Sequence, residues 1–168
     1  MIHLDIVDRL QLKPHPEGGF YRETYRSEGA IPQEALGPSF SGDRNYCTGI
    51  YFLLTHENFS AFHRIKQDEL WHFYAGDPLE VHVIDKKGKY VCHEVGTDFS
   101  AKQEPQLMVP AGCWFASGVK SGGKFSLVGC TVAPGFDFSD FELANRNELL
   151  QSYPQHREVI ERFTRVAK

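Results

Sequence analysis

The sequence lacks the features that would indicate a nucleic-acid-binding, membrane or disulfide-stabilised protein. It has no basic surplus, with 18 Lys and Arg against 22 Asp and Glu and a net charge of -4, whereas proteins that bind nucleic acid polymers need positive charge for the phosphates. The longest apolar run, around residues 50–54, is far shorter than the ~20 residues of a membrane helix. The N-terminus is acidic where a secretion signal would be basic. We therefore expect a cytosolic protein that binds neither nucleic acid nor a membrane.

Cysteine and methionine are also scarce. The four cysteines, Cys47, Cys92, Cys113 and Cys130, are far apart and form no Cys-x-x-Cys pair. This spacing favours free thiols over disulfides or a zinc cluster. There are two Met, but thirteen Phe, seven Tyr and two Trp bring the aromatic share to 13%.

The remaining composition is that of a globular domain. The chain has 168 residues, 41% of them hydrophobic and 24% charged, and single domains of roughly 100–200 residues are common. No linker or repeat divides it, so we expect one domain over 1–168, with its β core at about 18–134.

Short β-strands are predicted through the middle of the chain, because period-two or continuously apolar segments alternate there with turn residues. The predicted strands are Phe20–Arg26, Cys47–Leu54, Phe59–Ile65, Glu69–Ala75, Leu79–Ile84, Lys89–Glu94, Gln106–Val109, Cys113–Val119 and Phe125–Val132. Such closely spaced strands favour an antiparallel sandwich or barrel, an all-β fold. Helical spacing of apolar residues predicts short helices over 2–11 and 154–167, and residues 29–43 are expected to form one long loop.

Two motifs carry the most information about the fold. The segment 62–76 resembles the first cupin motif: His63 matches its first His, Glu69 its Glu and Gly76 its closing Gly, while Ile65 stands where the second His would be. The segment beginning Pro110-Ala111-Gly112 resembles the second cupin motif, with Phe115 at its His position. The resemblance implies a cupin double-stranded β-helix, also called a jelly-roll barrel.

The same comparison bears on metal binding. Metal-binding cupins use all three His and the Glu, whereas this chain keeps His63 and Glu69 alone. Most catalytic metals need at least three protein ligands. We therefore expect no cofactor, and if a divalent metal binds, His63 and Glu69 are its expected ligands, with the others coming from outside the motifs.

Three blocks are similar to the cupin-5 family, long catalogued as a domain of unknown function. They are His15–Tyr25, His63–His72 and Val132–Phe138. This likeness implies a ligand-sized pocket and a homodimer, without an agreed reaction. A more distant similarity to deoxysugar-nucleotide 3,5-epimerases, in which the equivalent His is a catalytic base, rests on the pattern around His63.

These resemblances suggest a site inside the barrel. His63 and Glu69 are the candidate catalytic pair, since a His and a Glu in an aromatic interior have shifted pKa values suited to acid–base chemistry. An idle buried pair inherited from a metal-binding ancestor is the competing interpretation. The candidate ligand-binding residues are those with a polar head or an aromatic ring near the motifs: Glu17, Tyr21, Arg22, Tyr46, Trp71, Phe73, Trp114 and Phe115.

Three functions remain open from the sequence. The first is a metal-independent isomerase or epimerase acting on a sugar or sugar nucleotide, with His63 as base and Glu69 tuning it. The second is a non-catalytic cupin that binds a small polar or nucleotide-like ligand. The third is a metal-dependent dioxygenase or isomerase with a non-standard ligand set.

Overall fold

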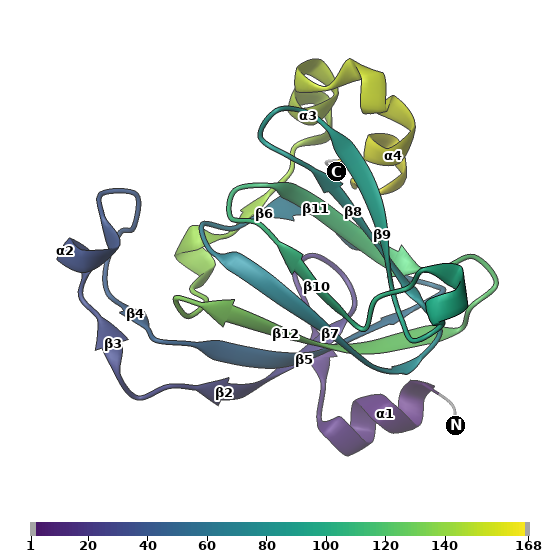
Figure 1. The fold of residues 1–168 in the computed structure, drawn as a ribbon, viewed down its shortest axis with the longest axis horizontal. Helices are drawn as coiled ribbons and strands as arrows, with labels where there is room; N and C mark the ends of the chain where they lie inside the picture. Colours follow the sequence, from purple (N-terminus) through teal and green to yellow (C-terminus); the bar gives the residue numbers. More distant parts are fainter. Residues whose placement is uncertain (1–2, 167–168) are drawn as a thin grey trace.

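The computed structural model describes residues 3–166 and is dominated by β-strands (Figure 1). The strands are β1 (Lys13–Pro14), β2 (Phe20–Arg26), β3 (Ala30–Ile31), β4 (Arg44–Asn45), β5 (Thr48–Thr55), β6 (Ser60–Arg64), β7 (Asp68–Gly76), β8 (Leu79–Ile84), β9 (Tyr90–Val95), β10 (Gln106–Val109), β11 (Trp114–Val119), β12 (Phe125–Ala133) and β13 (Glu142–Leu143). The α-helices are α1 (His3–Leu10), α2 (Gln33–Leu36), α3 (Arg146–Ser152) and α4 (Arg157–Arg162), and 3₁₀ turns cover Phe99–Ala101, Phe138–Asp140 and Pro154–His156.

The strands form two facing antiparallel sheets. One has the order β1-β2-β5-β12-β7-β10 and the other β13-β6-β11-β8-β9, while β3 and β4 form a separate ribbon. Strands that are far apart in the sequence pair with each other, as β12 does with both β5 and β7. This topology is a jelly roll, in which each sheet turns one face toward the other.

The core lies between the two sheets because inward-facing positions are apolar. On β8, Leu79, Val81 and Val83 alternate into this core. Trp71 and Phe115 come from opposite sheets and meet edge to face at 6.2 Å between ring centroids. The predicted strands are therefore confirmed closely, with bounds within one residue in every case.

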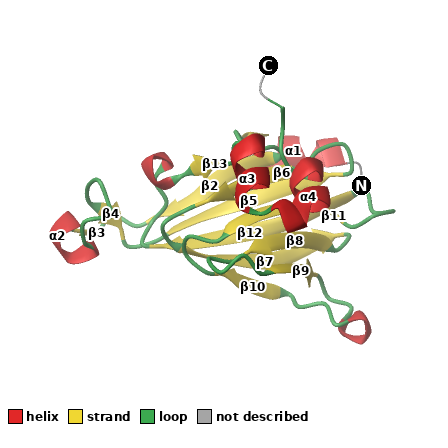
Figure 2. Ribbon diagram, turned by 90° about the horizontal axis from the view of Figure 1, so that it is seen from above, coloured by secondary structure: helices red, strands yellow, loops and turns green. Residues whose placement is uncertain are grey.

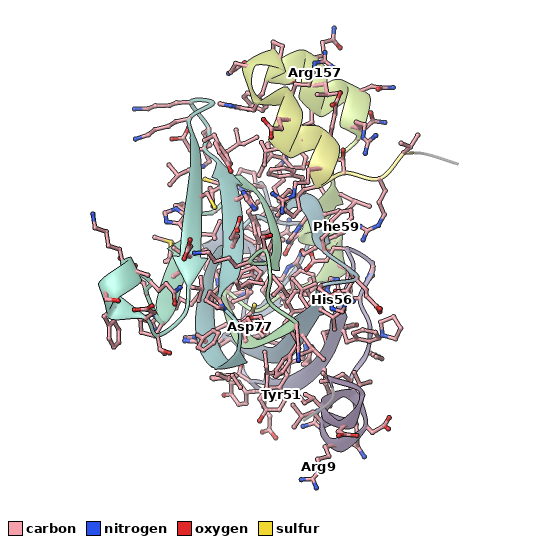
Figure 3. All side chains as sticks on the ribbon, turned by 90° about the vertical axis from the view of Figure 1, so that its right-hand side faces the viewer. Arg9, Tyr51, His56, Phe59, Asp77 and Arg157 are labelled. Carbon is pink, nitrogen blue, oxygen red and sulfur yellow. The ribbon has the colours of Figure 1, made fainter. Side chains whose placement is uncertain are left out.

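Helices α1, α3 and α4 pack on the outer faces of the sheets, whereas α2 lies apart from them beside β3 and β4 (Figure 2). Ile160 and Phe163 of the C-terminal segment pack on Phe62, Ile84 and other outward side chains of the five-stranded sheet. Helix α1 packs through Ile6 against Leu53 of the six-stranded sheet. Figure 3 shows the result from the side, with Arg157 of α4 and Arg9 of α1 at opposite ends of the molecule.

The helical predictions need correction at the C-terminus. In place of the helix predicted over 154–167, the chain forms a 3₁₀ turn followed by the shorter α4, which ends at Arg162. Residue 167 of this predicted helix and residue 2 of the N-terminal one lie outside the described residues. An unpredicted helix, α3, precedes it because the Asn145 side chain caps its first turn by accepting from the Glu148 amide at 3.2 Å. Pro154 separates α3 from α4 because proline cannot continue a helix from within.

The segment predicted as one loop, 29–43, also contains regular structure. It holds β3 and α2, and β3 pairs with β4 just beyond it. No helix among residues 3–166 is long and apolar enough to cross a lipid bilayer.

Candidate functional site

A cavity of about 490 Å³ opens between the two sheets. Its lining comes from β2, β5, β6, β7 and β12, from the N-terminal segment before β2, and from the loop after β12. Ligand-binding cavities in proteins commonly measure about 300–1,000 Å³. The cavity is therefore large enough for a small organic molecule.

Glu17 enters the cavity on a turn that depends on glycine. Gly18 and Gly19 have φ of 113° and 78°, a region that favours glycine. A side chain on Gly18 would also collide with the Phe59 carbonyl. The Glu17 carbonyl accepts from the Ala61 amide at 2.8 Å, which ties the turn to β6. The Glu17 side chain is thereby held beside His63, and the residue is 6% exposed.

His63 forms a buried ion pair with Glu17. Its Nε2 lies 2.8 Å from Glu17 Oε2, and its Nδ1 lies 2.7 Å from the Ala61 carbonyl oxygen. Burial by itself would lower the pKa of His63, but the Glu17 carboxylate outweighs it and raises that pKa above its ordinary value. Since both ring nitrogens face acceptor oxygens, the site favours the protonated form of His63, which donates two hydrogen bonds.

The same pair keeps Glu17 ionised. Burial opposes ionisation, but the His63 charge and hydrogen bond bring the pKa of Glu17 below its ordinary value. On the other side, His15 Nδ1 accepts from the Glu17 amide at 3.1 Å, and burial lowers the pKa of His15. Glu17 thus lies between two histidines whose pKa values are shifted in opposite directions.

Glu69, the second carboxyl group of the cavity, has the opposite state. It lies at the start of β7, and burial raises its pKa to about 8, with a further increase from the nearby Glu17 charge and an opposing effect from His63. At neutral pH Glu69 is therefore mostly a neutral carboxylic acid. It can donate a proton where Glu17 can accept one.

Trp71 adds a hydrogen-bond donor to the same wall, close enough to Glu69 to lower the pKa of that carboxyl group. The side chain is buried and lines the cavity, but its indole N–H forms no hydrogen bond with the described residues. Buried donors usually have partners. A ligand oxygen in the cavity would supply one.

Charged and aromatic side chains lie toward the mouth. Lys13, Arg26 and Phe138 line this region, and Phe138 is 49% exposed. Arg26 is held by Glu23 through two contacts of 2.8 Å. Lys13 lies over the Tyr21 ring at 5.4 Å, and it makes no ion pair with the described residues.

The structure brings together five of the residues that the sequence singled out: His63, Glu69, Glu17, Tyr21 and Trp71 line the cavity. Phe115 lies just behind it, with its ring centroid 4.1 Å from that of His63. The sequence prediction paired His63 with Glu69, however, whereas the direct contact of His63 is with Glu17.

Four predicted ligand-binding residues do not line the cavity. Trp114 faces outward, because its neighbour Phe115 on the same strand faces inward. The Arg64 guanidinium carbon lies 4.3 Å from the centroid of the Trp114 ring. Arg22 likewise faces outward, over Tyr51.

Tyr46 and Phe73 are the other two residues outside the cavity. Tyr46 is 56% exposed, just before β5. Phe73 packs against the barrel core without lining the cavity, on the stretch of β7 where the pairing with β12 shifts register.

Sequence reasoning missed several lining residues. His15 was not singled out, although its neighbours Glu17 and Tyr21 were, and Phe136 and Phe138 lie in a block that was named only for its family likeness. Phe141 was not singled out at all, although it lines the cavity with its ring centroid 5.3 Å from that of His63. A usable signal was the concentration of Phe residues between 136 and 141, directly after the last long strand.

The cavity does not offer the ligand set of a metal-binding cupin. Ile65 and Phe115 occupy two ligand positions of that set, and both nitrogens of His63 are engaged by oxygen atoms. Within residues 3–166, three metal-ligating side chains with ligand atoms within 4.8 Å of one another occur at Glu80, His82 and Cys92, outside the cavity. We therefore derive no chemistry in the cavity from a metal.

Comparison with known proteins agrees with this architecture. The chain is 42% identical to protein SO0799 from Shewanella oneidensis, with a TM-score of 0.89 over 99% of both chains. A hypothetical protein from Leishmania major is 38% identical, with a TM-score of 0.89 over 98% of this chain and 99% of that one. The uncharacterized protein YML079W of Saccharomyces cerevisiae is 30% identical over an alignment of 144 positions, and the match covers 80% of this chain and 71% of the yeast protein.

A more distant likeness concerns the fold alone. Oxalate decarboxylase from Bacillus subtilis is 15% identical, with a TM-score of 0.55 over 92% of this chain and 37% of the decarboxylase.

The family model described as "Cupin superfamily (DUF985)" matches residues 4–144. The all-β jelly-roll prediction is confirmed by these matches together with the two sheets. The chain belongs to the cupin superfamily, in the family described as DUF985.

Proposed function

We propose that the cavity binds a small polar organic molecule and catalyses proton transfer on it, as an isomerase or epimerase does. The observation that carries this proposal is that two carboxyl groups line one cavity in different surroundings, Glu17 paired with His63 at 2.8 Å and Glu69 buried. The pKa of Glu17 is lowered by His63, and the pKa of Glu69 is raised to about 8 by burial. Environments that separate the pKa values of two such groups are typical of acid–base sites.

The geometry favours a division of roles that differs from the sequence-based one. His63 as a direct base would need a free ring nitrogen, and both of its nitrogens face acceptors within 2.8 Å. Glu17 has its second oxygen, Oε1, available, 3.7 Å from His15 Nδ1. We assign Glu17 as the proton acceptor, His63 as the residue that keeps it ionised, and Glu69 as the proton donor.

A sugar or sugar-nucleotide-like ligand suits the rest of the lining. The donor of Trp71 and the two carboxyl groups offer hydrogen bonds to hydroxyl or carbonyl oxygens. Lys13 at the mouth provides a positive charge for a phosphate or carboxylate. The rings of Phe136 and Phe138, 4.9 Å apart at their centroids, offer apolar faces for stacking.

A non-catalytic binding role is the alternative, and one observation favours it. The His63–Glu17 pair satisfies its own hydrogen bonds, so it can stabilise the barrel without taking part in a reaction. Both functions predict that the same ligands bind, but only the catalytic one predicts that a bound ligand is converted.

The experiment first identifies ligands and then follows their protons. A thermal-shift screen with sugars, sugar nucleotides and small carboxylic acids finds binders, since a ligand that binds the native state raises its melting temperature. Each binder is then incubated with the protein in D₂O and followed by NMR. Incorporation of deuterium at a carbon next to a carbonyl supports proton-transfer catalysis. Tight binding without exchange, for every binder, contradicts it and supports the binding role.

The two tryptophans give a matched test of where the ligand binds. Trp71→Phe removes the indole donor inside the cavity, and we expect affinity to fall about five- to tenfold, the equivalent of one hydrogen bond of ~1 kcal/mol. Trp114→Phe makes the same change on the outer face and should leave affinity unchanged. Calorimetric titration of both variants measures this, and an equal loss in the two would place the ligand outside the barrel cavity.

A further inference from the structure

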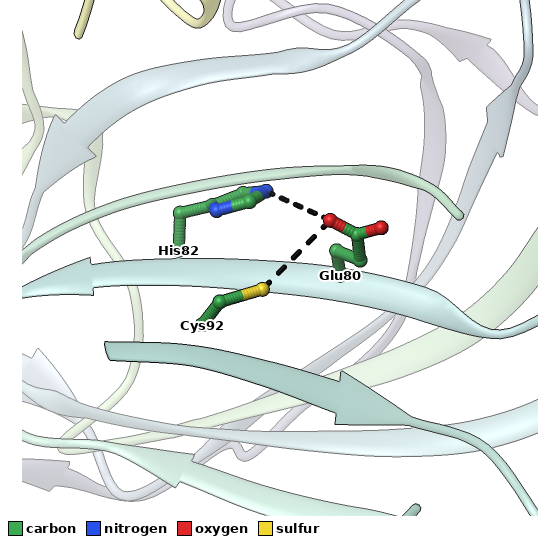
Figure 4. Close-up of side chains that lie close together, drawn as sticks. All are labelled: Glu80, His82 and Cys92. Atoms are coloured by element: carbon green, nitrogen blue, oxygen red, sulfur yellow. Dashed lines mark hydrogen bonds and ion pairs between the residues drawn. The ribbon is translucent and has the colours of Figure 1, made fainter. Parts of the chain in front are cut away.

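A second cluster of reactive side chains lies on the outside of the barrel, on the β8–β9 hairpin (Figure 4). His82 and Cys92 are directly opposite each other in the antiparallel pairing. Glu80 is two residues before His82 on the same strand and so shares its face. Val81 and Val83 face the core instead. The cluster is therefore separated from the cavity by the sheet itself.

The distances in this cluster match those between ligands of a single small ion. Glu80 Oε2 lies 3.5 Å from His82 Nε2 and 3.8 Å from Cys92 Sγ. The three ligand atoms all lie within 4.8 Å of one another. Zinc bonds of about 2.0–2.3 Å in tetrahedral geometry place neighbouring ligands roughly 3.3–3.6 Å apart. Small side-chain rotations would bring the three atoms to that spacing.

His82 has one buried nitrogen that forms no hydrogen bond with the described residues. The residue is 3% exposed, and its Nε2, which points toward Glu80 in Figure 4, makes no hydrogen bond with the described residues. Its Nδ1 lies 2.7 Å from the Tyr90 hydroxyl. Metal-binding histidines typically donate from one nitrogen to a neighbouring oxygen and coordinate with the other. His82 has this arrangement before any metal binds.

We propose that Glu80, His82 and Cys92 form a Zn²⁺ site. A thiolate, an imidazole and a carboxylate are ligands that zinc prefers, and three protein ligands leave one position open. Cys92 is exposed, so that position faces solvent. On binding, the Cys92 thiol releases its proton to water and coordinates as the thiolate. Sequence spacing does not reveal this site, because its thiol and imidazole meet only through strand pairing.

The positive charge of Arg162 opposes cation binding at this cluster. This exposed α4 residue lines the same surface depression as His82 and Tyr90. Because like charges repel, removing it should strengthen Zn²⁺ binding. Arg162→Gln thus tests the site by a gain of affinity, which damage to the fold would not produce.

The test measures Zn²⁺ binding to the full chain under reducing conditions, by calorimetric titration, and Co²⁺ binding by absorption spectroscopy. We expect one Zn²⁺ per chain and a thiolate-to-Co²⁺ charge-transfer band. Cys92→Ser should abolish the band and weaken Zn²⁺ binding at least tenfold, and Glu80→Gln should weaken it similarly. Arg162→Gln should strengthen it about two- to fivefold.

Matched controls separate this site from non-specific binding. Cys47→Ser removes another accessible thiol, and His93→Gln changes the next residue on β9, which faces the opposite side of the strand. Both should retain wild-type affinity and the Co²⁺ band. Absence of Zn²⁺ binding, or equal binding and an unchanged band in Cys92→Ser, would overturn the proposal. Because no step involves the cavity, its result is independent of the proposed catalytic function.

Discussion

Replacing Glu17 with alanine is expected to lower the free energy of unfolding by about 3–5 kcal/mol, because it leaves His63 buried without its counter-ion. His63 is 3% exposed, and its Nε2 contacts Glu17 at 2.8 Å. The main-chain contacts of Glu17 stay in place, so the loss reports on the carboxylate. Urea denaturation of both proteins at pH 6 measures it.

The pH dependence of this loss has a definite sign. The raised pKa of His63 contributes stability that is complete below its ordinary value of 6.5 and is lost as pH rises through the raised pKa. The lowered pKa of Glu17 contributes stability that is present above its ordinary value of 4.5 and is lost on acidification through the lowered pKa. The difference between the wild type and Glu17→Ala is therefore expected to be largest from about pH 4.5 to 6.5.

Glu23 provides the matched control for Glu17. It lines the same cavity, but its side chain is 41% exposed and pairs with Arg26. Exposed pairs contribute about 0–1 kcal/mol, so Glu23→Ala should have little effect. A double variant, Glu17→Gln with His63→Gln, should recover part of the loss because no charge then remains buried. Equal, small effects of Glu17→Ala and Glu23→Ala would show that the buried pair is not important for stability.

Replacing Glu69 with glutamine is expected to stabilise the protein at high pH and to remove its proton donor. The pKa of Glu69 is about 8 in the folded state against 4.5 ordinarily, so the unfolded chain loses this proton at lower pH than the native protein does. Wild-type stability should therefore fall from about pH 4.5 to 8 on account of this group. Glutamine does not ionise, and the variant should gain about 2–4 kcal/mol at pH 8, a value that allows for water reaching the carboxyl from the cavity.

Activity should change in the opposite direction. If Glu69 is the proton donor, Glu69→Gln should reduce deuterium exchange or turnover of a bound ligand about 10²- to 10⁴-fold, with ligand affinity largely retained. Denaturation at pH 4.5 and pH 8, together with NMR exchange, gives both readouts. Glu104→Gln, the same change at an exposed position, should alter neither. A Glu69→Gln variant that is no more stable at pH 8 than at pH 4.5, relative to wild type, would show that Glu69 is already ionised at neutral pH.

Sequence alone determined most of the barrel. Alternating apolar residues and Gly-, Asp- and Pro-containing turns placed the long strands within a residue of their bounds, because strand periodicity and turn chemistry are local properties. The same alternation puts Phe115 and Trp114 on opposite faces of their strand. Which of these two faces points into the barrel depends on the neighbouring strands, so the sequence did not decide it. The motif around His63 identified the superfamily, since its spacing reflects one hairpin of the fold.

Tertiary structure decided the chemistry of the site. Glu17 and His63 are far apart in the chain and meet because the Gly18–Gly19 turn is tied to β6. Glu69 has no such ion pair, and its pKa is raised by burial and by the Glu17 charge, so it is the carboxyl group that stays neutral. His82 and Cys92 likewise become neighbours only through the register of β8 and β9. Local patterns specify elements, whereas pairs of ionisable groups acquire their properties from neighbours that only folding brings close.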